Sequence, residues 1–149
     1  MMRIVLAILA SLVLTACEIA HSGGKTPDGR AIKVIVYDEG GVIENYDAHI
    51  KHLNNIGTKV KLMGVHISAG TMYLGANDVC VHPTARLGFH GSWLNKPGEK
   101  SKYDAMMAKY YTPALRDWYY ENAANVQVAW VSMSGQELHD RFGYALCEV

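Results

Sequence analysis

Short apolar runs alternate with amphipathic stretches along most of the chain. Runs of β-branched residues that end at turn-forming residues predict buried strands, whereas apolar residues at spacings of three and four predict helices. The predicted strands are residues 32–37, 60–65, 79–82 and 87–90, and the predicted helices between them are 43–56 and 68–76. Strands that alternate with helices predict an α/β fold with a mostly parallel sheet.

The later part of the chain is predicted to be mainly helical. Residues 100–125 carry Tyr, Met and Trp at helical spacing, a pattern typical of a core or of a partner-facing surface. Pro113 divides this stretch and suits the first turn of a second helix, with Thr112 as its N-cap. Residues 134–137 have the pattern of a capping box for a short helix. Residues 126–131 and 144–149 are predicted to be extended.

The first residues have the character of a secretory signal peptide. Arg3 precedes an apolar run over residues 4–14, which is too short to span a bilayer because a spanning helix needs about 20 residues. The run ends at Leu14-Thr15-Ala16-Cys17, which resembles the lipobox of bacterial lipoproteins, where the cysteine is lipidated and becomes the mature N-terminus. The alternative is a plain signal peptide with Cys17 at its cleavage point.

These features predict a signal peptide at 1–16, a flexible polar tether at 17–30 and one domain at 31–149. Several acyl chains on Cys17 would hold the protein stably at a membrane. Glu18 after the cysteine, by similarity to other lipoproteins, implies outer-membrane attachment with the domain facing the periplasm. In that oxidising compartment Cys80 and Cys147, both in predicted strands, could form a disulfide or remain two buried thiols.

The charge balance excludes one class of partner. The 149 residues include 14 Lys and Arg against 14 Asp and Glu, so the formal net charge is zero. Nucleic-acid binding normally requires a basic face, and none is indicated here. His49 and His52 lie three apart on a predicted helix and could ligate a metal, but they are more typical of a polar face. The sequence predicts no metal and no cofactor.

Three features have the residue types that hydrolytic chemistry requires. Gly40-Gly41 follows a predicted buried strand, where the backbone N–H groups of a glycine turn can bind an anion or oxyanion. Ser68 lies where a strand meets a helix, a position that favours developing negative charge, although a serine there is also a common N-cap. His90 ends a strand 22 residues later and could act as the base for such a serine.

In this order the features resemble motifs of the Clp protease proteolytic subunit and its ClpP/crotonase-like relatives. The matching segments, between about residues 32 and 92, are Gly40-Gly41-Val42-Ile43, Met63-Gly64 with Ser68 and Gly70, and Gly88-Phe89-His90. The resemblance implies stacked β-β-α units and hydrolysis of amide or peptide bonds. It also implies Ser68 as nucleophile, His90 as general base, and the N–H groups of Gly41 and Ala69 as the oxyanion hole.

The chain departs from this family at the third catalytic member. In the family an aspartate lies just before the last helix, whereas residues 129–132 contain no carboxylate. Asp140 comes later, inside the capped helix, where it is either this member or a solvated helix residue. Asn125, a backbone carbonyl or a Ser-His dyad are the alternatives. The family's ring-forming elements before the glycine turn are also missing, so no caged protease ring is expected.

Two functions follow from these expectations. The first is a membrane-tethered periplasmic serine hydrolase acting on peptides or small acyl substrates. The second is a catalytically inactive lipoprotein that binds a partner or forms a homo-oligomer, with the aromatic stretch 103–120 as its contact surface. An exposed, continuous aromatic stripe would favour the second function.

Overall fold

The computed structural model describes residues 22–93 and 99–148, which form one α/β domain. The strands are β1 (Ser22–Lys25), β2 (Ala31–Asp38), β3 (Lys59–Ile67), β4 (Val79–Val81), β5 (Arg86–Phe89) and β6 (Val131–Ser134). The helices are α1 (Ile43–Asn55), the 3-10 helix η1 (Ser68–Gly75), α2 (Glu99–Ala108), α3 (Pro113–Asn122) and α4 (Gly135–Phe142). The predicted α/β class is therefore confirmed.

The six strands form one mixed sheet in the order β1-β2-β3-β5-β6, with β4 also paired to β3. The central pairings of β3 with β2, β4 and β5 are parallel, as the sequence predicts. β3 is long enough for β4 to pair with its first part, at Val60–Leu62, and for β5 to pair with its end, at Val65–Ile67. The outer pairings, β1 with β2 and β5 with β6, are antiparallel.

A bulge between β2 and β3 depends on Gly64. The register shifts between Ile35 and Tyr37, and Gly64 has a φ of 65°. A Cβ at this position would lie 2.1 Å from the carbonyl oxygen of Val36, so only glycine fits there. Beyond the bulge, Asp38 pairs with His66, which brings the ends of the two strands side by side.

Two segments differ from the sequence prediction. Of the predicted tether, residues 22–30 belong to the domain, because Ser22–Lys25 pair with β2 and Thr26 and Arg30 close the turn that follows. The predicted strand at 126–131 is wrong in position: β6 begins at Val131, where it pairs with Phe89, and Val128 is 96% exposed. Alternating apolar residues at 126–131 indicated a strand, but the available partner, β5, lies opposite 131–134.

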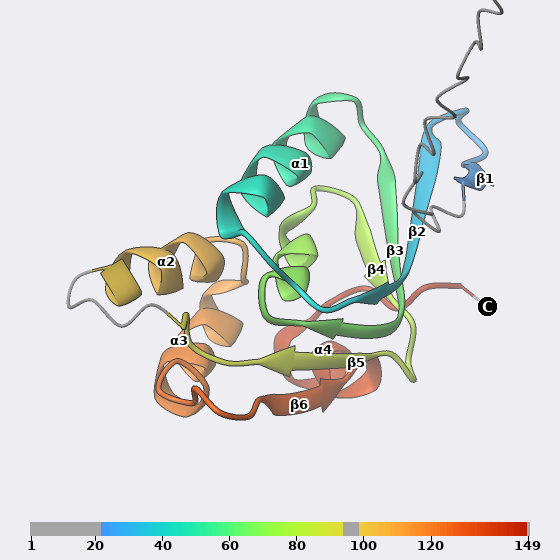
Figure 1. Ribbon diagram of the computed structural model, residues 1–149. Coiled ribbons are helices and arrows are strands. Elements are labelled where there is room, and N and C mark those ends of the chain that lie inside the picture. The colour runs from blue at the N-terminus through green and yellow to red at the C-terminus, as the bar shows by residue number, and fades with distance from the viewer. Residues whose placement is uncertain (1–21, 94–98, 149) are drawn as a thin grey trace, which may run out of the picture.

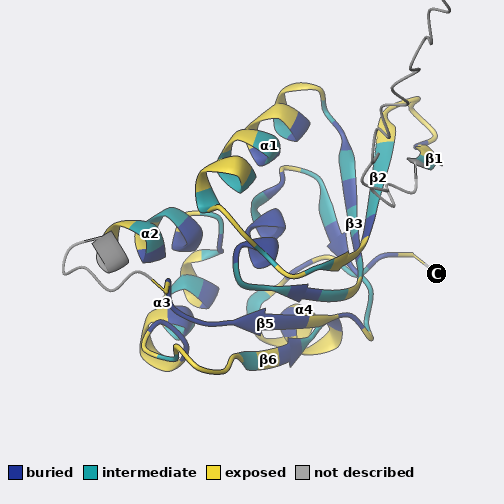
Figure 2. Cartoon of the chain, in the orientation of Figure 1, coloured by how far each residue is buried: buried dark blue, intermediate teal, exposed yellow. Residues whose placement is uncertain are grey.

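The helices pack around one core. In Figure 1, α1 and the short helix η1 lie on one side of β2, β3 and β4, while α2 and α3 gather beyond β5 and β6 at the end away from β1. Figure 2 shows η1 and β5 buried over most of their length and the outer face of α1 exposed. Thr112 caps α3 and Ser134 with Glu137 forms the capping box of α4, as predicted.

The aromatic stripe at 103–120 is mainly core. Met107, Tyr111, Leu115 and Tyr119 are each less than 5% exposed, and Tyr111 and Tyr119 pack edge-to-face. The sequence left open whether this stripe covers the core or a partner. Over residues 103–120 the stripe is therefore not the continuous exposed surface that would favour a binding module.

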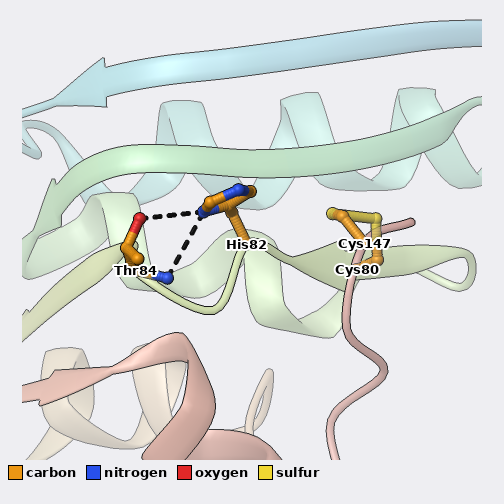
Figure 3. The surroundings of a disulfide bond; sticks show 4 residues. All are labelled: Cys80, His82, Thr84 and Cys147. Carbon is orange, nitrogen blue, oxygen red and sulfur yellow. Dashed lines mark hydrogen bonds between the residues drawn. A yellow bond between two sulfur atoms is a disulfide. The ribbon is translucent and has the colours of Figure 1, made fainter. Parts of the chain in front are cut away.

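A disulfide joins Cys80 on β4 to Cys147, with the two Cα atoms 4.8 Å apart (Figure 3). The last segment, predicted as extended, lies along β4 through backbone hydrogen bonds from Val81 to Ala145 and from Cys147 to Val81. Leu146 makes an isolated parallel bridge there rather than a full strand. After β4, the ring of His82 bonds to the hydroxyl of Thr84 in the turn that leads to β5.

The predicted signal peptide at 1–16 and the lipidation site Cys17 lie outside the described residues. Within 22–93 and 99–148, no helix combines the length and apolar character needed to cross a bilayer.

Candidate active site

Ser68 has an unusual backbone conformation at the junction of β3 and η1. Its φ is 57°, the one positive value at a residue other than glycine among those described. The N-cap of η1 is Ile67, and no side chain caps the helix, so the interpretation of Ser68 as an ordinary N-cap is wrong. Strained residues of this kind are concentrated at functional sites, and serine nucleophiles are often presented on a sharp strand-to-helix turn.

The glycine turn after β2 packs directly against this serine. Gly40 has a φ of 84°, and a Cβ there would lie 2.7 Å from the Cβ of Ser68 and 2.9 Å from the nitrogen of Ala69. The Asp38 carboxylate accepts a hydrogen bond from the Gly40 N–H at 2.8 Å and another from the Tyr46 hydroxyl at 2.5 Å. Asp38 therefore fixes the turn against the strand-to-helix junction.

Ser68, His90 and Gly41 line one cavity of about 660 Å³. This is within the range of small-molecule sites, about 300–1,000 Å³. Its walls are largely apolar and aromatic, and include Tyr37, Val42, Trp93, Tyr103, Met107 and Trp130. Of these, Tyr37, Val42, Trp93 and Trp130 are each more than half exposed. Among the residues that the structure describes, three of the predicted site residues thus share one apolar pocket.

His90 follows β5 and is buried. Its Nδ1 lies 2.7 Å from the carbonyl oxygen of Gly91 and 3.1 Å from the indole nitrogen of Trp93. Among the described residues, no hydrogen bond joins the ring to Ser68. The pairing of Ser68 with His90 as nucleophile and base therefore stays a prediction, made for two residues that line the same cavity.

Buried side chains of two helices form hydrogen bonds to the backbone around His90. The buried Asp104 accepts a hydrogen bond from the Ser92 N–H at 2.6 Å and another from the Tyr119 hydroxyl at 3.1 Å. The same hydroxyl lies 3.2 Å from the His90 carbonyl oxygen. Helices α2 and α3 therefore hold the backbone around His90 through one buried polar network.

The third catalytic member has several sequence candidates, and one lies beside the ring. The Gly91 carbonyl can accept from Nδ1, which is the role that the aspartate plays in a serine triad. Asp140 is exposed on α4, accepts a hydrogen bond from Gln136, and does not line the cavity. Asn125 is also exposed and is not a lining residue. The geometry favours the backbone carbonyl.

The charges at the cavity are negative. Among the described residues, Glu39 and Glu44 line it and no Lys or Arg does. A hydrogen bond from Tyr103, aided by nearby Lys102, lowers the pKa of Glu44, and Tyr37 donates to Glu39. With two acidic side chains and no basic one among its described lining residues, the cavity should disfavour anionic ligands.

Ala69 and two histidines outside the cavity make other contacts. Ala69 is buried directly after Ser68 and is not among the lining residues of the cavity. His49 bonds through Nδ1 to the Tyr73 hydroxyl at 2.9 Å. His66 is fully buried with Nε2 on the Met63 carbonyl, and burial lowers its pKa. Within the described part of the chain, no group of three or more metal-binding side chains comes together.

Several residues of the site carry no strong sequence signal. Trp93 is a single aromatic residue after the predicted strand at 87–90, and Trp130 is one apolar residue among several at 126–131. Asp104 is one charge among several on a helix. Asp38 could have been found, because an aspartate two residues before a glycine commonly accepts a hydrogen bond from the backbone of a turn. No known family model matches the chain, and no curated protein sequence matches it.

Proposed function

We propose that this domain is a serine hydrolase of the ClpP/crotonase-like type, acting on peptides or small acyl substrates. The observation that carries the proposal is the left-handed Ser68 at the end of a central strand, in the same cavity as His90. The parallel pairings of β3, the glycine turn on Ser68 and the apolar walls support the same assignment. The net negative rim favours neutral or cationic substrates.

The proposed reaction proceeds through an acyl-enzyme. The Ser68 oxygen forms a bond to the substrate carbonyl carbon as its proton passes to Nε2 of His90, and the carbonyl π pair becomes the oxyanion. The N–H groups of Gly41 and Ala69 are the proposed donors to that oxyanion. The tetrahedral species then expels the amine or alcohol, which takes the proton from His90, and water releases the acyl group by the same steps.

A fluorophosphonate probe tests this proposal. The wild-type full chain should be labelled on Ser68, as mapped by peptide mass, and Ser68→Ala should abolish labelling. His90→Ala should slow labelling by about 10²–10⁴-fold, the usual contribution of a general base. Ser132→Ala, a change at an exposed serine of β6 outside the cavity, is the matched control and should label like the wild type. Labelling that persists in Ser68→Ala would refute the site.

A binding role is the second candidate, and the exposed aromatic rim favours it. Tyr37, Trp93 and Trp130 surround the cavity and are each more than half exposed. Exposed aromatic groups of this kind often mark ligand or partner sites. An apolar ligand that quenches Trp fluorescence while Ser68 stays unreactive toward the probe would favour this role.

We also propose that Cys17 carries a lipid anchor and that the domain acts outside the cytoplasm. The Leu14–Cys17 motif and the Cys80–Cys147 disulfide support this location. The Cys17→Ser variant should lack the acyl mass that the wild-type protein carries. It should be found in the soluble fraction rather than in the membrane fraction. Unchanged partitioning, with no loss of acyl mass, would show that Cys17 is not the anchor.

A further inference from the structure

One nitrogen of His90 faces two hydrogen-bond partners of opposite kind. Nδ1 lies 2.7 Å from the Gly91 carbonyl oxygen and 3.1 Å from the Trp93 indole nitrogen. A carbonyl oxygen can only accept a hydrogen bond, and an indole N–H can only donate one. Because Nδ1 carries either a proton or a lone pair, a neutral His90 forms one of these bonds at a time.

The choice of partner decides the chemistry of the other nitrogen. When Nδ1–H donates to Gly91, Nε2 has a free lone pair and can accept the Ser68 proton. When Trp93 donates to Nδ1, the single proton lies on Nε2, which can then only donate. The wrong tautomer is costly in a serine enzyme, since a triad Asp→Asn change that produces it lowers kcat about 10⁴-fold.

We propose that Trp93 is a positioning residue that competes with the Gly91 carbonyl for Nδ1 and so lowers the fraction of His90 in the tautomer that can deprotonate Ser68, until a substrate displaces the indole. The Gly91 carbonyl belongs to the buried backbone, whereas Trp93 is 67% exposed and lines the cavity. Its ring lies edge-on to His90, with centroids 5.9 Å apart. Only the indole can therefore move away, and an apolar group entering the cavity competes for its surface.

This role of Trp93 rests on the proposed hydrolase function, but the tautomer of His90 can be measured without any reaction. The full chain with ¹⁵N-labelled histidine is studied by NMR about two pH units above the ordinary histidine pKa, where neutral imidazole dominates. His90→Gln identifies the His90 signals. Trp93→Phe keeps an aromatic ring and removes the donor, and Trp130→Phe is the matched control at the same cavity.

Trp93→Phe should lower the ratio of the Nε2–H tautomer to the Nδ1–H tautomer by about twofold to tenfold. This is the change in population that corresponds to the net free energy of one hydrogen bond. Trp130→Phe should leave the tautomer ratio as in the wild type. An unchanged ratio in Trp93→Phe, or the same shift in Trp130→Phe, would overturn the inference.

A small fluorophosphonate, too short to reach Trp93, supplies the second readout. In its reaction the Ser68 oxygen bonds to phosphorus, fluoride leaves, and the proton passes to His90. Trp93→Phe should be labelled faster by the factor by which the Nδ1–H fraction of His90 rises, and slower labelling would contradict the proposed role. If Trp93→Phe shifts the tautomer ratio but no variant is labelled, the proposed hydrolase function is wrong. The assignment of Trp93 as a hydrogen-bond partner of Nδ1 would still hold.

Discussion

An alanine at Gly40 is expected to lower the free energy of unfolding by about 2–5 kcal/mol and to slow labelling of Ser68 about 100-fold. Two costs combine at this position. A residue with a Cβ is unfavourable at a φ of 84°, and that Cβ would lie within 3 Å of Ser68, the Ile67 carbonyl and the Ala69 nitrogen. These are backbone and near-backbone atoms, so the turn must move away from Ser68.

Gly29 separates the two costs. Its φ of 85° matches that of Gly40, but a Cβ there would meet no atom within 4 Å. Gly29→Ala should therefore cost only the conformational part, about 1–2 kcal/mol, and leave labelling of Ser68 unchanged. Chemical denaturation of both variants, with probe kinetics, provides the measurement. Equal losses of stability in the two variants would show that the contact between Gly40 and Ser68 contributes nothing.

Replacing both Cys80 and Cys147 by alanine is expected to remove about 4 kcal/mol of stability, the chain-entropy value for a loop of this length. The two cysteines are 67 residues apart, and both are buried. Without the bond, the last segment is held to β4 mainly by the hydrogen bonds of Val81 with Ala145 and Cys147. We expect this segment to open first.

Urea unfolding with and without a reductant measures this loss in the wild type, and the double alanine variant should not respond to the reductant. Hydrogen exchange should show lost protection at Val81 and Cys147 before the rest of the sheet. Equal stability of oxidised and reduced wild type would contradict the expected contribution of the disulfide.

The central strands of the fold were predictable because most of their residues are apolar, although neither strand is buried on both faces: β2 buries Ile35, and β3 buries Val60, Leu62 and His66. The short apolar-rich runs at 32–37 and 60–65 predict strands, so β2 and β3 follow from the sequence. The strands at the edges of the sheet were harder to predict. β1 is rich in glycine and is set by pairing with β2, and the position of β6 is set by β5, which local composition does not encode.

The site shows the same division. Ser68, His90 and Gly41 could be selected from the sequence because each lies at or shortly after the end of a predicted strand, and the ends of neighbouring parallel strands meet. The hydrogen-bond partner of His90 could not be selected from the sequence, since it is a backbone carbonyl, which any residue supplies. Trp93, Trp130 and Asp104 reach the site through loops and helix packing, which spacing along the chain does not reveal.

The left-handed backbone of Ser68 lowers the stability of the folded protein at the residue that is the proposed nucleophile. Any side chain there costs about 1–2 kcal/mol that glycine avoids, and the extra freedom of glycine in the unfolded chain offsets about 0.5–1 kcal/mol of that gain. Selection for thermal resistance alone would therefore favour glycine at position 68. Such selection would remove the Ser68 hydroxyl group, which does not cap η1, and with it the proposed nucleophile.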